Sequence, residues 1–232
     1  MRKIISYSIA FALITSIFFG NLLCTNAAES EMLQIEVDGL VFTSAEYTKD
    51  EYSYVKRYDG ENILVDILNT KNECIETLTI YPEETIQDKT RASGTYVQRP
   101  YSHQKSAKVG IVTVCKVEND LVLKIFSSGS FTQIEDVISN TVHKADGFSS
   151  MQIGGTPVAS AISPTGSFPT TSVDCYYSAT CEGSFDVGLN LGVSAELGIK
   201  KLKDAGFNVT GNVGTTIYYT KNVSSSWNVS VM

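Results

Sequence analysis

Four cysteines and two histidines carry the reactive side chains of this chain after its first 28 residues. The cysteines are Cys74, Cys115, Cys175 and Cys181, and the histidines are His103 and His143. In an oxidising compartment four cysteines allow three disulfide pairings. The short spacing of Cys175 and Cys181 favours a local bridge across a turn. Cys74 and Cys115 would then join the two halves of the chain or stay as buried thiols.

Metal binding and catalysis receive little support from these residue types. Two histidines and no C-x-x-C pair argue against a zinc site, and no hydrolase, phosphate-loop or dinucleotide motif is present. His103 falls in a polar stretch that reads as a loop, and Cys115 falls in an apolar run, where a thiol is inert. We therefore expect no catalytic, metal-binding or cofactor-binding residue. A glycosidase that uses carboxylates alone stays open, because sequence spacing does not define a cleft.

The N-terminal 28 residues have the organisation of an export signal. Arg2 and Lys3 precede an apolar stretch from 4 to 19, and cleavage is expected after Ala27 or Ala28. The sequence predicts a secreted protein. Lipidation at Cys24 and an uncleaved anchor are the alternatives.

Charge is unevenly distributed between two parts of the chain. Residues 29–92 hold 15 acidic and 6 basic residues, whereas residues 93–232 hold 10 of each. This pattern predicts a small acidic β-rich unit at 29–81, a linker at 82–94 and a β-rich domain at 95–232. Lys89 and Arg91 in the linker are candidate processing sites. Neither part is basic enough for nucleic-acid binding.

Short alternating apolar runs separated by turn signals predict a mostly β protein. It is all-β, or α+β with at most one short helix, and forms an antiparallel sandwich or an elongated sheet. The one expected helix lies at 132–147, where Thr132 and Glu135 form a capping box.

The clearest pattern is an alternation at 185–219 that predicts a long amphipathic β-hairpin. Its apolar face supplies the candidate membrane-facing residues Phe185, Val187, Leu189, Leu191, Val193, Leu197, Ile199, Phe207, Val209, Val213 and Ile217. Lys200, Lys201 and Lys203 form a basic tip between the two arms.

Two functions follow from this hairpin. If a second layer covers its apolar face, it is the wall of a secreted, non-enzymatic protein that binds an extracellular or cell-surface partner or builds surface structure. If the face is free, the hairpin inserts into membranes, which requires an oligomer because a single hairpin leaves its edges unpaired. In this alternation alone, the chain resembles β-pore-forming toxins. The acidic N-terminal region would then belong to a precursor.

Overall fold

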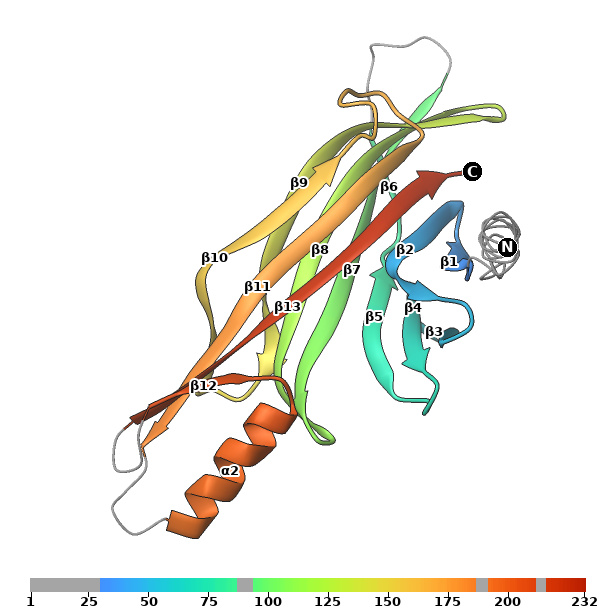
Figure 1. Ribbon diagram of the computed structural model, residues 1–232. Coiled ribbons are helices and arrows are strands. Elements are labelled where there is room, and N and C mark those ends of the chain that lie inside the picture. The colour runs from blue at the N-terminus through green and yellow to red at the C-terminus, as the bar shows by residue number, and fades with distance from the viewer. Residues whose placement is uncertain (1–29, 87–93, 187–191, 212–215) are drawn as a thin grey trace, which may run out of the picture. The chain divides into compact units, whose positions relative to one another are not determined.

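The computed structural model describes residues 30–86, 94–186, 192–211 and 216–232, and the side chains of 192–195 lie outside this description. Met32–Met232 form one compact unit. Within the described ranges this unit holds two antiparallel sheets and a single helix, α2 (Gly192–Asp204) (Figure 1). The predicted fold class, a mostly β protein with antiparallel sheets, is confirmed.

The first sheet has the strand order β1–β2–β13–β11–β10, and β12 pairs with β13. Its strands are β1 (Met32–Val37), β2 (Leu40–Thr48), β10 (Met151–Ile162), β11 (Ser172–Asp186), β12 (Asn208–Thr210) and β13 (Thr216–Val231). The second sheet has the order β3–β4–β5–β7–β8–β9, and β6 pairs with β7. Its strands are β3 (Tyr52–Asp59), β4 (Asn62–Asn69), β5 (Cys74–Ile80), β6 (Glu84–Ile86), β7 (Thr95–Val109), β8 (Val112–Ser128) and β9 (Phe131–Gly147).

Both sheets combine strands from before and after the predicted linker at 82–94. In the first sheet β13 pairs with β2, and in the second sheet β5 pairs with β7. The predicted division between 29–81 and 95–232 therefore does not divide the sheets. The early strands form local hairpins, but their buried apolar residues share one core cluster with residues of later strands. β6 lies inside the predicted linker, and Lys89 and Arg91 lie outside the described residues, as do Ala27 and Ala28.

The inward faces of the two sheets form a shared hydrophobic core. One cluster joins Phe42, Trp227 and Val229 of the first sheet to Leu78 and Leu121 of the second. A second cluster contains residues of both sheets as well, among them Val117 of β8 and Tyr177, Ala179 and Val223 of β11 and β13. Alternating inward residues on both sheets therefore make a β-sandwich core.

The expected helix at 132–147 is wrong, because Phe131–Gly147 is strand β9. Its backbone pairs with β8 from Phe131 to Gly147, with three register shifts. The β-branched residues in this stretch favour a strand, and pairing with β8 outweighs the local capping signal at Thr132 and Glu135.

The first arm of the predicted hairpin at 185–219 is also wrong, because β11 ends at Asp186 and Gly192–Asp204 is helix α2. The apolar alternation in this stretch also fits a helical repeat, since Ala195, Ile199 and Leu202 are spaced by four and three residues. Ala, Glu, Leu and Lys dominate the segment, and all four are strong helix formers.

A Schellman motif ends α2. The amide of Phe207 donates to the Leu202 carbonyl at 3.0 Å, and the amide of Gly206 donates to the Lys203 carbonyl at 2.9 Å. Gly206 has φ 79°, a conformation that glycine adopts at little cost. The chain then returns through β12, which pairs with β13 between Asn208 and Thr220. The second arm is thus a short hairpin against β13.

Substitutions at Gly198 test whether this segment is a helix. Gly198 lies within α2, and apart from its chain neighbours and the helix backbone, no atom of the described residues stands within 4 Å of a Cβ placed there. We expect Gly198→Ala to raise Tm by about 2–4 °C, because alanine exceeds glycine in helix propensity by about 1 kcal/mol. Gly198→Val should raise Tm less. Thermal unfolding of the two variants is the measurement, and a larger gain for valine would indicate a strand.

Candidate functional site

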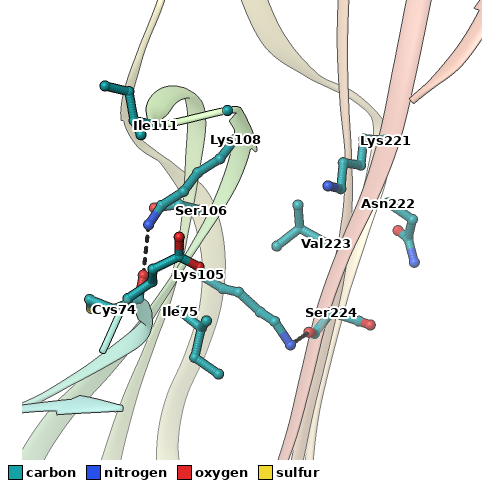
Figure 2. A pocket seen from close by; sticks show the side chains of 12 residues that line it. Cys74, Ile75, Lys105, Ser106, Lys108, Ile111, Lys221, Asn222, Val223 and Ser224 are labelled. Atoms are coloured by element: carbon teal, nitrogen blue, oxygen red, sulfur yellow. Dashed lines mark hydrogen bonds between the residues drawn. The ribbon is translucent and has the colours of Figure 1, made fainter. Parts of the chain in front are cut away.

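A pocket of about 480 Å³ lies where β13 of the first sheet faces β5 and β7 of the second (Figure 2). We call it the lysine pocket, because three of its lining residues are Lys105, Lys108 and Lys221. The other lining residues are Glu73, Cys74, Ile75, Ser106, Gly110, Ile111, Asn222, Val223 and Ser224. The lining holds three cationic groups and one acidic group, and Glu46, outside the lining, pairs with Lys105.

Backbone carbonyls hold the lysine side chains in place. Lys105 Nζ donates to the Ser224 carbonyl at 2.7 Å, and Lys108 Nζ donates to the Cys74 carbonyl at 2.7 Å. Lys221 Nζ donates to the Ala205 carbonyl at 2.8 Å. Partial burial lowers the pKa of Lys221 from its usual value. The pocket therefore presents ammonium groups whose positions are set by both sheets and by the segment after α2.

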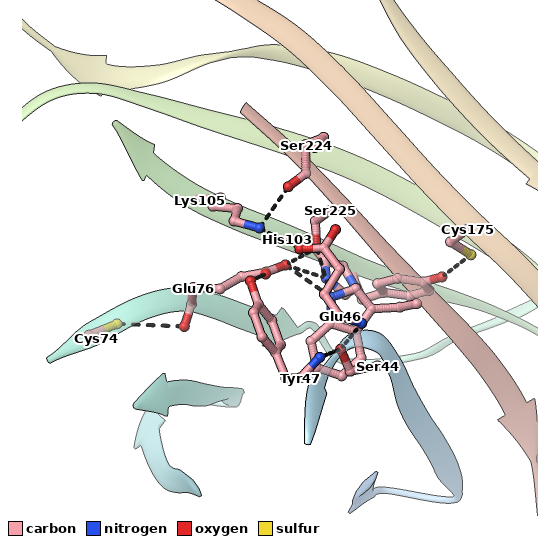
Figure 3. A network of polar contacts seen from close by, with 12 residues as sticks. Ser44, Glu46, Tyr47, Cys74, Glu76, His103, Lys105, Cys175, Ser224 and Ser225 are labelled. Carbon is pink, nitrogen blue, oxygen red and sulfur yellow. Dashed lines mark hydrogen bonds and ion pairs between the residues drawn. The ribbon is translucent and has the colours of Figure 1, made fainter. Parts of the chain in front are cut away.

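A buried polar cluster lies beside the pocket and joins the two sheets (Figure 3). We call it the Glu76 network. The Glu76 carboxylate, on β5, accepts hydrogen bonds from Tyr47 of β2 at 2.8 Å and from His103 Nδ1 of β7 at 3.2 Å. It also accepts bonds from Ser225 at 2.7 Å and Trp227 Nε1 at 3.0 Å, both on β13. Donors from both sheets thus meet on one carboxylate.

The electrostatics of the network favour an ionised carboxylate. Burial alone raises the pKa of Glu76, but the hydrogen bond and charge of His103, the charge of Lys105 and the Ser225 hydrogen bond together lower it below its usual value. A carboxylate only accepts, so Nδ1 of His103 carries the hydrogen of that bond. Burial, followed by the charge of Glu76, raises the pKa of Tyr47, which keeps its phenol a donor.

Lys105 connects the network to the pocket. It lies opposite Glu76 in the pairing of β5 with β7, and its ammonium is 2.8 Å from a carboxylate oxygen of Glu46. The same ammonium lies 5.3 Å from the centre of the Tyr47 ring. The Ser44 hydroxyl accepts hydrogen bonds from the backbone amides of Glu46 and Tyr47 at 2.9 and 2.8 Å, which turns Tyr47 inward. Lys105 therefore lines the pocket and also interacts electrostatically with the Glu76 carboxylate.

The histidines do not lie where the sequence suggested. His103 belongs to strand β7 and is 2 % exposed, whereas a loop was expected. It is in phase with buried Tyr101, so its side chain points into the core. His143 lies on β9, and its ring nitrogens are 3.6 Å from Glu118 and 3.3 Å from Asp120.

The predicted bridge between Cys175 and Cys181 is wrong. All four cysteines within the described residues are free thiols. Cys175 and Cys181 lie on the single strand β11, which separates them by about 20 Å at about 3.3 Å per residue. The turn that the bridge required is absent, because β11 runs without interruption from Ser172 to Asp186.

The apolar residues of the predicted hairpin lie in different environments. Phe185, Ile199 and Val209 pack around Ile217, which is fully buried, and Phe207 joins the second core cluster. Leu197 is 55 % exposed. Val187, Leu189, Leu191 and Val213 lie outside the described residues, as does the side chain of Val193.

The predicted basic tip also has a different setting. Lys200, Lys201 and Lys203 are exposed on α2 and do not form the end of a hairpin. Lys201 and Lys203 occupy the last turn, where cations interact favourably with the helix dipole.

The comparisons with known proteins match no protein family, no curated protein and no solved structure. Among the residues that the structure describes, no group of three or more His, Cys, Asp and Glu side chains is arranged to hold a metal ion. In the same ranges, no helix is both long and apolar enough to cross a membrane.

The Glu76 network generates a stability prediction. Glu76→Gln removes the charge and sets an amide group against donors, so we expect the free energy of unfolding to fall by about 3 kcal/mol. This loss corresponds to a decrease in Tm of about 6–12 °C. Glu61→Gln, at an exposed position, is the matched control and should leave Tm unchanged.

The pH dependence of this difference has a definite sign. The folded-state pKa of Glu76 lies below the ordinary value of 4.5, so its contribution is complete above that value and is lost as pH falls through the folded-state value. Urea unfolding of wild type and Glu76→Gln from pH 7 to pH 3 measures this. A stability difference that stays constant over the range would contradict an ionised Glu76.

Proposed function

We propose that this protein is an extracellular, non-enzymatic binding protein, and that the lysine pocket binds an oxyanion group of its ligand. The observation that carries the proposal is the placement of Lys105, Lys108 and Lys221 around one pocket between the sheets. Lysine ammonium groups bind phosphate and related oxyanions as point charges. A volume of about 480 Å³ falls in the usual range for small-ligand sites.

The hydrogen bonds of the lysines favour binding, because they order the side chains before a ligand arrives. Each ammonium has three N–H donors, and the bond to Ala205 uses one donor of Lys221. The bond to Cys74 uses one donor of Lys108 in the same way. An oxyanion entering the pocket meets charges whose conformational freedom is already reduced, which lowers the cost of binding.

The apolar part of the lining indicates the rest of the ligand. Ile75 and Val223 lie on facing strands of the pocket, and Ile111 is 96 % exposed at the end of the β7–β8 hairpin (Figure 2). A ligand that carries an apolar chain next to its oxyanion would cover the exposed surface of Ile111 and the partly exposed surface of Ile75, and would gain about 25 cal/mol for each Å² removed from water. We therefore expect an amphiphilic anion to bind more tightly than a free ion.

The burial of Glu76 and His103 supports a non-enzymatic role. This carboxylate and imidazole could serve as an acid–base pair, but they are 1 % and 2 % exposed. A general base must reach the proton it removes, either directly or through one water. The pair instead holds the sheets together beneath the pocket. The export signal read in the first 28 residues supports an extracellular location.

Calorimetric titration with two probes tests the binding proposal. We expect hexyl phosphate to bind more tightly than inorganic phosphate, and we expect Lys108→Gln and Lys221→Gln each to weaken hexyl phosphate binding by about tenfold or more. Lys56→Gln, at an exposed position on β3, is the matched control and should bind as wild type does. Equal affinities in all four proteins would contradict the proposal, provided that the variants keep the wild-type Tm.

Membrane insertion is the second candidate function, and α2 bears on it directly. Helix residue Ile199 packs on Ile217, which gives part of the apolar face a cover. On the same helix, Leu197 is 55 % exposed and lies close in sequence to the basic residues Lys200 and Lys201. The contact of Ile199 with Ile217 favours the binding protein. Exposed Leu197, with Lys200 and Lys201 nearby, is the feature that favours contact with an anionic membrane.

Dye leakage from phosphatidylglycerol vesicles separates the two functions. We expect the wild type to release no dye. Ile217→Asp should lower the free energy of unfolding by several kcal/mol, because it buries an unpaired charge. Leu197→Asp, at an exposed position, should leave Tm unchanged. Leakage by the wild type that Leu197→Asp abolishes without a change in Tm would support insertion and contradict our preference.

A further inference from the structure

Two buried thiols face each other across the sandwich. Cys115 lies on β8 of the second sheet and Cys181 lies on β11 of the first, and both residues are 0 % exposed. Their sulfur atoms are 2.8 Å apart. Side chains of both sheets surround them, among them Ala107, Val117 and Ala179.

We propose that Cys115 and Cys181 are a disulfide-forming pair that covalently joins the two sheets of the exported protein. A disulfide requires two sulfurs that can approach to about 2.05 Å and Cβ atoms about 3.5–4.5 Å apart. The observed thiols need to move less than 1 Å toward each other. Strand pairing fixes the backbone on both sides, because Cys115 pairs with Ala107 of β7 and Cys181 pairs with Lys221 of β13.

The other two cysteines have different partners. The Cys175 thiol is 3.3 Å from the Tyr101 hydroxyl, deep in the first core cluster. The Cys74 sulfur is 3.5 Å from the Thr77 hydroxyl at the edge of the lysine pocket. The structure therefore favours a bridge between Cys115 and Cys181, which belongs to one of the three pairings that the sequence allows. Cys74 and Cys175 stay as thiols.

The oxidant that the reaction requires is a disulfide, either of a thiol–disulfide oxidoreductase or of a small molecule such as oxidised glutathione. The Cys115 thiolate attacks one sulfur of that disulfide and releases the other as a thiolate, which gives a mixed disulfide. The Cys181 thiolate then attacks the Cys115 sulfur, the bridge forms, and the oxidant leaves as a dithiol, or as two thiols where it is oxidised glutathione. Two electrons pass to the sulfurs of the oxidant, which also take up two protons in place of those lost by the cysteine thiols. Both sulfurs are buried in the folded protein, so the exchange takes place during folding.

In the folded protein, the surroundings of Cys115 favour its thiolate form. The hydrogen bond from the Cys181 thiol and the positive charge of Lys144 lower the pKa of Cys115, although burial opposes this. Lys144 Nζ is held by the carbonyls of Phe148 and Met151 at 2.7 and 2.8 Å. Of the two cysteines, Cys115 on β8 therefore forms the thiolate more readily.

Peptide mapping of the secreted wild-type protein tests the pairing. The protein is alkylated in denaturant without reduction and then digested. We expect a peptide linking Cys115 to Cys181, and we expect alkylated Cys74 and Cys175. Alkylation of Cys115 and Cys181 in the wild type would overturn the proposal, and so would a link between any other two cysteines.

Thermal unfolding with and without reductant gives a second readout. The bridge closes a long loop, since 66 positions separate its ends, and such a constraint is expected to raise Tm by about 10 °C. Reduction with dithiothreitol in denaturant, followed by refolding in dithiothreitol, should lower Tm of the wild type and of the control Cys74→Ala by this amount. Tm of Cys115→Ala and Cys181→Ala should not respond. A wild-type Tm that reductant leaves unchanged would contradict the proposal, and the peptide map remains decisive if either alanine variant fails to fold.

Discussion

One buried carboxylate sets the arrangement of the two sheets. Glu76 comes from the second sheet, and three of its four hydrogen-bond donors, Tyr47, Ser225 and Trp227, come from the first. A buried charge is tolerated only when it is paired and hydrogen-bonded, so these groups must keep their positions. Lys105 lies opposite Glu76 on β7 and bonds to the Ser224 carbonyl next to Ser225. The requirement to satisfy Glu76 therefore also places one wall of the lysine pocket.

The β architecture could be predicted from local alternation, but the partners of each strand could not. Alternation reports which residues share a face and says nothing about which distant strand they face. Even so, one signal for the network was present in the sequence. Glu76 is in phase with Leu78 and Ile80, and Ser225 is in phase with Trp227, so polar groups stood at positions that the pattern assigns to the core. The lysine pocket left no such signal, because β5, β7 and β13 meet only in the folded chain.

The error at 185–204 has a physical cause. Apolar residues in this stretch satisfy a period of two and a helical period at once, and alternation alone does not distinguish them. Composition distinguishes the two structures, since α2 is rich in helix formers whereas β9 is rich in β-branched residues. The capping signal at the start of β9 was misleading. The cysteines follow the same logic. Short spacing along the chain suggested a local bridge, whereas a straight strand keeps Cys175 and Cys181 apart and brings Cys181 to Cys115 of the other sheet.

In the function that we propose, three lysines from two sheets form one oxyanion site. The most direct measurement is anomalous diffraction from a crystal of the wild-type protein soaked in selenate, an oxyanion whose selenium atom can be located without ambiguity. We expect an anomalous peak in the lysine pocket, with selenate oxygens within hydrogen-bond distance of Lys105, Lys108 and Lys221, and we expect that peak to vanish in Lys108→Gln. Selenate bound only at other places on the protein, or a peak in the pocket that Lys108→Gln leaves unchanged, would contradict the account.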